Sequence, residues 1–482
     1  MSQIIKKLNP DVIAKTARRC REREIVIPTF AQLRDPGLIP DQIKNKLAGV
    51  GMDEVNPLNL FRITWKNNTA TGLYGPVNWL EIPRQVSGVR ARIIGLVGKY
   101  FPTGTHKVGA AFGCLVPRLV SGEFDPLVHK AVWPSTGNYC RGGAFDCALL
   151  GCAAVAILPE EMSPERFDWL RRIGAEVIAT PGCESNVKEI YDKCWELRRD
   201  PAYMIFNQFD EFGNPIFHYQ VTGPAIAETF EGLAGKKRLA AFISATGSAG
   251  TIAAGDFLKS RFPSVKVVAS EALQCPTLLL NGFGGHRIEG IGDKHVPWVH
   301  NLRNTDAVAA IDDEDCLRLL RLFNEPTGLK FLNQLGVEAP DRLGLLGISG
   351  ICNLLAAVKT ARYFELTEDD VIFTVFTDSV ELYRSRLSEQ NREKGSYRLP
   401  EAGRDHAAVL THQGIDYFKE LGYYDRKAIH NLKYFTWVEQ QGKSYAEILA
   451  QWDPAYWHEL FENEVHHFDR LIEAFNHQAG WQ

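Results

Sequence analysis

The sequence predicts an α/β fold in which parallel sheets are covered by helices, and two observations support this prediction. From about residue 90 to 400, short apolar runs rich in β-branched residues alternate with amphipathic stretches. Apolar runs of this length are typical of buried strands, and their alternation with helices is typical of parallel sheets. Helix-start signals agree with the pattern, since Ser163, Pro164 and Glu165 open the segment SPERFDWLRRIG.

The expected elements follow one another in a regular order. The expected strands are ARIIGLV, KAVWPS, AAVAILP, AEVIATP, MIFNQF, LAAFISATG, VKVVASEA and DVIFTVFTD. The expected helices between them include SPERFDWLRRIG, SNVKEIYDKCWELRRD and AGTIAAGDFLKSRF. Residues 1–60 are more polar and broken by prolines, and we expect a helical N-terminal extension there. Residues 401–482 hold helical patterns, four tryptophans and seven of the 13 histidines, which predicts a helical C-terminal extension.

Composition and charge argue against several classes of protein. The chain has 482 residues and a formal net charge of −4, so it offers no basic field to nucleic acid. No apolar run approaches the ~20 residues that span a bilayer, and the charged first segment lacks the apolar core of a signal peptide. The ten cysteines form no CxxC pair, so we expect buried thiols in a reducing cytoplasm. His466, His467 and Asp469 fit no ligand motif, and no metal site is predicted.

Glycine-containing turns follow several expected strands, and each can present backbone N–H groups to an anion. They are PSTGN at residues 134–138, SATGSAGT at 244–251 and EGIGDKHVP at 289–297. Another expected strand ends in the polar residues Thr377, Asp378 and Ser379. A lysine, Lys107, stands between the turn FPTGT and a run of small residues. Composition alone predicts a surface lysine, whose aliphatic stem covers apolar surface while its amine stays in water.

The segment SATGSAGT has the chemistry of a phosphate-binding loop. Glycine and alanine let the backbone approach a ligand closely, and successive N–H groups at a helix start bind a phosphate. The same pattern also serves as a plain strand-to-helix turn. It is not GxxxxGK[ST], and no GxGxxG follows the first strand, so nucleoside triphosphate and dinucleotide sites are disfavoured.

A lysine near one turn, a phosphate loop at another and a polar strand end together suggest pyridoxal phosphate. That cofactor needs an amine for its aldehyde, a cradle for its phosphate and a partner for its ring nitrogen. The three features occur in this order along the chain.

From about Phe61 to Tyr383 the chain resembles the cysteine synthase and cystathionine β-synthase family of fold type II pyridoxal-phosphate enzymes. The resemblance rests on PTGTHK, PSTGN, LPEEMSPERFDWLRRIGAEVIATPG, NQFDEFGNPIFHYQVTGPAIAE, TGSAGT and TDSVELY. It implies a tryptophan synthase β-like fold with two twisted, mostly parallel sheets. The implied domains are a smaller one at residues 61–215, which carries the lysine, and a larger one at residues 216–400, which carries the phosphate loop. It also implies a homodimer, for which the tryptophan-bearing tail is a candidate contact surface.

The resemblance assigns roles to the motif residues. Lys107 is the implied catalytic residue and covalent anchor of the cofactor. The implied cofactor-binding residues are Lys107, Asn138, Gly247, Ser248, Ala249, Gly250, Thr251 and Ser379. The implied substrate-binding residues are Ser135, Thr136, Gly137, Asn138, Gln208 and Gly290. Neighbours on a strand face opposite ways, so only one of Asp378 and Ser379 can face the ring nitrogen, and we favour Ser379.

The expected reaction is the loss of a β-substituent from a serine- or cysteine-like amino acid through an α-aminoacrylate. Addition of a thiol or sulfide then makes the enzyme a β-replacing synthase. One alternative is a β-lyase of the desulfhydrase or ammonia-lyase type that releases pyruvate, and another is a catalytically silent regulatory protein that binds the cofactor. Lys294 and His295 stand where relatives have small or aromatic residues, either to recognise a charged second substrate or as rim residues in water.

Overall fold

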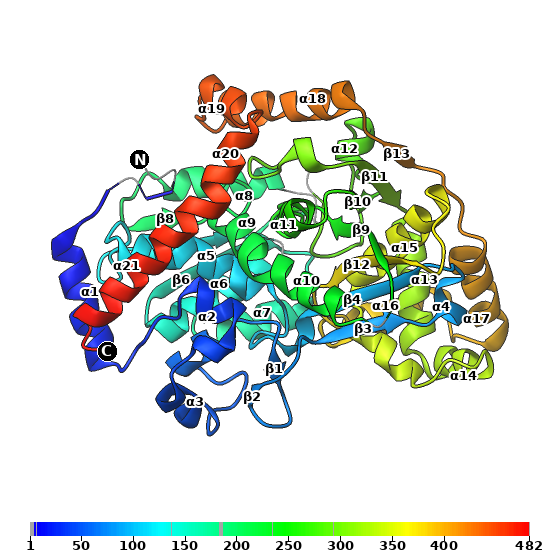
Figure 1. The fold of residues 1–482 in the computed structure, drawn as a ribbon, viewed down its shortest axis with the longest axis horizontal. Helices are drawn as coiled ribbons and strands as arrows, with labels where there is room; N and C mark the ends of the chain where they lie inside the picture. The colour runs from blue at the N-terminus through cyan, green and yellow to red at the C-terminus, as the bar shows by residue number, and fades with distance from the viewer. Residues whose placement is uncertain are drawn as a thin grey trace.

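The computed structural model describes residues 4–5, 7–135, 137–182, 187–233, 235–292 and 294–481. Two sheets form the centre of the molecule, and helices cover their faces (Figure 1). The predicted α/β architecture is confirmed, with parallel pairing inside both sheets.

The larger sheet has seven strands in the order β13-β11-β10-β9-β12-β4-β3. The five central strands run parallel, while β13 and β3 pair antiparallel at the two edges. In sheet order, the strands are Phe418–Glu420, Ala307–Ile311, Lys266–Ala272, Arg238–Ala245, Asp370–Phe376, Arg92–Val97 and Trp79–Ile82. Every residue of β12 is buried, as expected for a central strand covered on both faces.

The smaller sheet has four parallel strands in the order β7-β6-β5-β8. They are Glu176–Thr180, Ala153–Pro159, Lys130–Pro134 and Tyr203–Ile205. A separate antiparallel pair joins β1, Asn67–Asn68, to β2, Leu73–Tyr74. All eight predicted strands are therefore present, and β11, with the alanine-rich sequence AVAAI, is a buried strand that the sequence pattern missed.

The helices alternate with the strands, and η marks short 3-10 and π-helical segments. Before β5 they are α1 Pro10–Glu22, α2 Phe30–Arg34, η1 Pro36–Leu38, α3 Asp41–Leu47, η2 Pro57–Arg62, α4 Arg84–Ser87, η3 Gly98–Tyr100 and α5 Lys107–Val120. From β5 to β11 they are α6 Asn138–Leu150, α7 Pro164–Arg172, α8 Val187–Leu197, α9 Gly213–Phe217, η4 His218–Thr222, α10 Gly223–Glu231, α11 Ala253–Arg261, α12 Thr277–Leu280 and η5 Leu302–Asn304. Between β11 and β13 they are α13 Asp313–Asn324, α14 Pro326–Gln334, η6 Pro340–Leu345, α15 Ile348–Tyr363, η7 Val380–Leu382, α16 Arg384–Lys394, α17 Leu399–Asp405 and η8 His406–Thr411. After β13 they are α18 Tyr423–Asn431, η9 Tyr434–Val438, α19 Tyr445–Ala450, α20 Pro454–His458, η10 Glu459–Asn463 and α21 Glu464–Gln478.

Helix α5 is held close to α9 because glycines remove the side chains between them. A Cβ at Gly113 would come within 2.2 Å of the Gly213 carbonyl oxygen, and one at Gly109 within 2.0 Å of the Phe217 ring. Real Cβ atoms do not approach that closely, so larger residues here would push α5 away. This contact fixes the position of Lys107, the first residue of α5.

The two terminal extensions pack against each other and against α5. In Figure 1, the C-terminal helix α21 lies beside the N-terminal helix α1. The Asp469 carboxylate accepts hydrogen bonds from the backbone of Phe30 (2.7 Å) and Ala31 (3.2 Å), and Arg21 Nε donates to the Ala479 carbonyl (3.0 Å). Both extensions are helical, as predicted.

The domain boundaries at residues 60, 215 and 400 stay a prediction. The smaller sheet lies wholly inside residues 61–215, whereas β3 and β4 of that segment pair with the larger sheet, and β13, beyond residue 400, lies at its far edge. Among the described residues, no helix combines the length and apolar character needed to cross a membrane.

Candidate active site

Lys107 lies at the start of α5 with its amine directed to the loop after β9. The Lys107 Nζ donates a hydrogen bond to the Ser248 Oγ at 3.1 Å. Burial lowers the pKa of this amine to about 8, since desolvation disfavours the charged form. A lysine with such a pKa is partly neutral near neutral pH, which is the state that a nucleophilic or basic amine needs.

The loop at residues 247–251 connects β9 to α11. Ala249 adopts a left-handed conformation with φ of +56°, so the alanine carries local strain. A Cβ on Gly250 would come within 1.9 Å of the Asn214 Oδ1, and one on Gly247 within 3.2 Å of the Ile291 Cα. The two glycines therefore let the loop lie against Asn214 and against the EGIG turn.

Asn214 connects this loop to the substrate side of the site. Its Nδ2 donates to the Gln208 carbonyl oxygen (3.0 Å) and to the Ser248 Oγ (3.1 Å). Gln208 in turn donates from its Nε2 to the Ser135 Oγ at 3.3 Å. A continuous set of hydrogen bonds thus joins Lys107 to the PSTGN turn.

The PSTGN turn ends at the first residue of α6, Asn138. Ser135 Oγ accepts the Gly137 N–H at 3.1 Å, and a Cβ at Gly290 would lie 3.7 Å from the Asn138 Nδ2. Thr136 lies outside the described residues. The N-terminus of a 13-residue helix, backed by hydroxyl and amide groups, suits a carboxylate.

Asp378 and Ser379, at the end of β12, are both buried but have different surroundings. Asp378 Oδ2 accepts hydrogen bonds from the Asn138 Nδ2 (2.6 Å) and the Tyr383 hydroxyl (2.7 Å). Burial raises the pKa of the Asp378 carboxyl above its ordinary range. These contacts involve Asp378 and do not test the role of Ser379 toward a ring nitrogen, which stays a prediction.

Arg166 is the main residue of the site that the sequence pattern missed. Its guanidinium is buried and donates to the Glu289 Oε2 (3.1 Å), the Asn138 Oδ1 (3.1 Å) and the Tyr383 hydroxyl (3.2 Å). A Cβ on Gly137 would come within 1.8 Å of the Arg166 Nη1, so the glycine makes room for the guanidinium. In the sequence Arg166 is one of several charged residues in an amphipathic helix, and only the tertiary packing reveals that it is buried.

Two further buried residues, His106 and His218, lie behind Lys107 and the phosphate-loop candidate. Their rings meet edge to face at 4.9 Å, and burial lowers the pKa of each well below its ordinary value. His106 Nε2 contacts the Thr377 Oγ1 (3.3 Å), and His218 Nε2 contacts the Thr251 Oγ1 (3.5 Å). Neutral rings here add no positive charge beside the Lys107 amine.

Lys294 and His295 lie away from these contacts. The Lys294 Nζ lies 6.0 Å from the centre of the Phe283 ring, and the His295 ring stacks on Tyr191 at 6.0 Å. Neither contact distinguishes substrate recognition from a position at the rim.

The donor set fits pyridoxal phosphate. A partly neutral amine faces a glycine-containing loop at a strand end, as an aldehyde and a phosphate on one molecule require. Buried polar atoms without a partner in the described part of the chain also surround this region, namely Asn214 Oδ1, His106 Nδ1 and Asp378 Oδ1.

Comparison with known proteins settles the family. The sequence model of the family described as "Pyridoxal-phosphate dependent enzyme" matches residues 97–331. A cysteine synthase from Staphylococcus aureus is 31% identical over 285 residues, which cover 59% of this chain and 84% of that protein. This chain belongs to the pyridoxal-phosphate-dependent family that includes the cysteine synthases. Pyridoxal phosphate is therefore its cofactor, as predicted.

Other members of the family agree with this assignment. A probable cysteine synthase from Bacillus subtilis is 30% identical over 286 residues, covering 59% of this chain and 85% of that protein. The structure of O-acetylserine sulfhydrylase isoform 3 from Entamoeba histolytica is similar with a TM-score of 0.58 and 23% identity, covering 70% of this chain and 94% of that one. The O-acetylserine-dependent cystathionine β-synthase from Helicobacter pylori has a TM-score of 0.54 and 23% identity, covering 64% and 95%. At these identities the two structures support the fold, which is the predicted type II fold.

Proposed function

We propose that this protein is a pyridoxal-phosphate enzyme that removes the β-substituent of a serine- or cysteine-like amino acid and adds a thiol or sulfide in its place. The observation that carries the proposal is the 3.1 Å contact between the Lys107 amine and Ser248 of the phosphate-loop candidate. This contact supports a site in which Lys107 binds the aldehyde and the loop that contains Ser248 binds the phosphate. Cysteine synthases among the relatives support the same reaction class.

Several contacts support the proposed roles of the site residues. The loop at residues 247–251 holds the phosphate, and Asn138 lies at the ring side, where Arg166 fixes its amide by donating to the Asn138 Oδ1 (3.1 Å). Ser135, Gly137 and Gln208 receive the substrate carboxylate at the start of α6, with Gly290 opposite. Ser379 is the proposed partner of the ring nitrogen.

The bound cofactor supplies an electron sink for the negative charge that develops at the substrate Cα. Lys107 Nζ then acts as the base that takes the Cα proton, which a partly neutral amine can do. Ser248 Oγ holds the amine in place through the 3.1 Å hydrogen bond. The neighbouring neutral rings of His106 and His218 and the surrounding burial keep competing charge and water away from this nitrogen.

Pyruvate release, measured with and without added sulfide or thiol, tests this function. A β-replacing enzyme should give a thioether or cysteine product, and its release of pyruvate should fall when the nucleophile is added. Pyruvate release that is unaffected by any nucleophile would instead support the β-lyase, which shares the first half of the reaction. A Lys107→Ala variant should lose both activities, and turnover by that variant would refute the role of the lysine.

We also propose a cytoplasmic homodimer. The described cysteines are free thiols, and all but Cys152 are buried, which suits a reducing compartment. Two tail tryptophans, Trp437 and Trp457, are buried within their own chain, so the exposed face of the tail is left as the candidate contact surface. Light scattering on the full chain and on a chain ending near residue 400 tests this arrangement, and a dimer that persists without the tail would exclude the tail as the contact.

A further inference from the structure

A buried histidine, His218, lies behind the phosphate-loop candidate at residues 247–251. It is the first residue of η4, a π-helical segment that packs against α11, the helix that follows this loop. Its ring has a hydroxyl on both sides, with the Thr222 Oγ1 2.9 Å from Nδ1 and the Thr251 Oγ1 3.5 Å from Nε2. Because π-helical turns are rare and occur mostly at functional sites, a role for this ring in the site is expected.

The direction of these hydrogen bonds follows from Trp65. An indole N–H can only donate, and the Trp65 Nε1 donates to the Thr222 Oγ1 at 3.0 Å. The Thr222 side chain is fully buried, so its own hydroxyl proton needs an acceptor inside the protein. Among the described residues, the His218 Nδ1 is the remaining hydrogen-bond partner of this oxygen. Thr222 therefore donates to Nδ1.

The histidine passes this direction on to Thr251. Burial lowers the pKa of His218 well below its ordinary value, so the ring is neutral. A neutral ring that accepts at Nδ1 carries its proton on Nε2. This proton faces the Thr251 Oγ1, across a long contact of 3.5 Å. Because the Thr251 oxygen accepts on this side, its own hydroxyl proton is turned away from the histidine.

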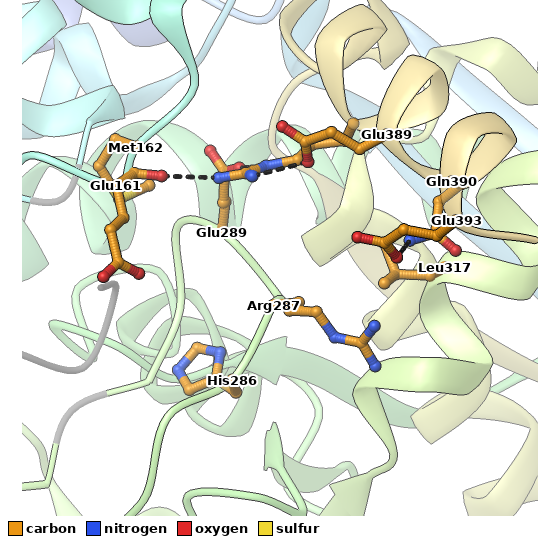
Figure 2. A pocket seen from close by; sticks show the side chains of 10 residues that line it. Glu161, Met162, His286, Arg287, Glu289, Leu317, Glu389, Gln390 and Glu393 are labelled. Carbon is orange, nitrogen blue, oxygen red and sulfur yellow. Dashed lines mark hydrogen bonds and ion pairs between the residues drawn. The ribbon is translucent and has the colours of Figure 1, made fainter. Parts of the chain in front are cut away.

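The neighbouring cavity of about 430 Å³ is a poor alternative place for a phosphate. Figure 2 shows the four carboxylates that line it, namely Glu161, Glu289, Glu389 and Glu393. Its two guanidiniums are already paired, Arg287 with Asp313 (2.8 Å) and Arg386 with Glu289 (2.5 Å). This excess of negative charge repels a dianion, which favours the loop at residues 247–251 as the phosphate site.

From these directions we infer that Thr222 and His218 orient the Thr251 hydroxyl as a donor to the phosphate of the cofactor. Both are positioning residues, because they act only through Thr251. A phosphate dianion only accepts, whereas a free hydroxyl can turn either way, so a hydroxyl that is already turned away from the ring loses less freedom on binding. The inference rests on the proposed function, since it takes residues 247–251 as the place of the phosphate.

Nitrogen NMR of the cofactor-free protein, labelled with 15N-histidine, tests the predicted position of the ring proton. The protonated and unprotonated nitrogens of a neutral imidazole have well-separated chemical shifts. We expect the His218 signals, identified by their absence from a His218→Phe or a His218→Gln variant, to show the proton on Nε2. A proton on Nδ1, or an equal mixture of the two tautomers, would overturn the inference, because Thr251 would then donate to the ring.

Ligand affinity tests the effect on the phosphate. Thr222→Val keeps the shape of the side chain but removes the hydroxyl that orients the ring. We expect the dissociation constant for pyridoxal phosphate to rise roughly 10-fold, as for the loss of one hydrogen bond to a charged group. The constant for pyridoxal, which lacks the phosphate, should stay unchanged, and Thr222→Ser should recover the wild-type affinity. An equal loss for both ligands would show a purely structural effect and overturn the inference.

Two further variants complete this test. Thr251→Val removes the last hydroxyl of the series, so adding Thr222→Val to it should weaken pyridoxal phosphate binding no further, and additive losses would overturn the inference. Thr305→Val is the matched control. The Thr305 Oγ1 lies 2.9 Å from the Nε2 of another buried histidine, His300, and neither residue is hydrogen-bonded to the loop in the described structure, so cofactor affinity should stay at the wild-type value.

Failure of this inference and failure of the proposed function give different results. The NMR and affinity measurements need no turnover, whereas release of pyruvate and formation of the thioether test the reaction. If the wild-type enzyme turns over an amino acid but Thr222→Val binds pyridoxal phosphate as tightly as wild type, the function stands and the inference is wrong. If no amino acid yields pyruvate or product while Thr222→Val weakens the binding of pyridoxal phosphate alone, the inference stands and the proposed reaction is wrong.

Discussion

A methyl group at Gly250 should weaken cofactor binding without contacting the cofactor's amine. The added Cβ would come within 1.9 Å of the Asn214 Oδ1 and 2.6 Å of its Nδ2, so the amide must turn away. Turning it breaks the Asn214 hydrogen bonds to the Gln208 carbonyl (3.0 Å) and to Ser248 Oγ (3.1 Å). Ser248 also accepts from Lys107, so the perturbation reaches the amine.

The size of the effect follows from these two bonds. Each buried hydrogen bond contributes about 1 kcal/mol net, so their joint loss amounts to about 2 kcal/mol. If that energy is used to hold the loop in its binding shape, the dissociation constant for pyridoxal phosphate rises roughly 30-fold. Titration of the cofactor-free protein, followed by quenching of tryptophan fluorescence, measures the change.

Two further variants serve as controls for this prediction. In Gly403→Ala the new Cβ meets only the Phe331 ring, at 3.6 Å, so cofactor affinity should stay at the wild-type value. Asn214→Ala removes the same hydrogen bonds without a clash, so it should weaken binding about as much as Gly250→Ala, and the double variant should be no weaker than either. Additive losses in the double variant, or unchanged affinity in Gly250→Ala, would refute the proposed connection through Asn214.

Three other predictions concern charged groups. Because the Lys107 pKa is about 8, the yield of borohydride-trapped cofactor on Lys107 should rise between pH 7 and pH 9. The free energy of unfolding should also rise with pH from about 8 to ~10.4, since in this range the native lysine binds fewer protons than the unfolded one. Asp146 is buried with both carboxyl oxygens unpartnered in the described structure, and burial raises its pKa well above the usual range. The Asp146→Asn variant should therefore gain stability relative to wild type as the pH increases from 5 to 8. A difference in denaturant midpoint that does not change with pH would contradict this. Arg166→Met leaves Glu289 buried with one cation fewer and should cost about 3 kcal/mol of unfolding free energy, whereas adding Glu289→Gln should restore part of that loss; a double variant as unstable as the sum of both singles would argue against the pair.

The strands could be predicted because their signals are local, and the phosphate-loop candidate follows one of them. Runs such as DVIFTVF combine β-branched residues with full burial, and SATGSAGT follows one of them directly. Strand β11 escaped prediction because AVAAI is short and rich in alanine, a residue that also favours helices. Its position becomes clear only from its pairing with β10.

The missing parts of the site depend on contacts between distant segments. Arg166 and Glu289 are 123 residues apart in the sequence, and Asn138 and Asp378 are 240 apart. A single sequence shows a charge or an amide at each of these positions but not its partner. For the same reason, the sequence could not decide which of Asp378 and Ser379 faces the ring nitrogen, since the partners of Asp378 come from α6 and from the segment after η7.

The C-terminal extension takes part in shaping the site, although it lies outside the residues that match the family model. Lys433 is fully buried, and its Nζ donates to the carbonyls of Trp298 (2.9 Å) and His300 (2.8 Å) and to the Gln451 Oε1 (2.7 Å). Trp437 Nε1 adds a bond to the Val296 carbonyl at 2.8 Å.

Burying an ammonium without a carboxylate is costly, and it lowers the pKa of Lys433 well below its ordinary value. Three acceptors offset that cost only if the segment at residues 296–300 keeps this one conformation. That segment continues from the EGIG turn, which carries both Glu289 and Gly290. The C-terminal extension therefore holds in place the segment that follows the EGIG turn, although the extension lies outside the residues that match the family model.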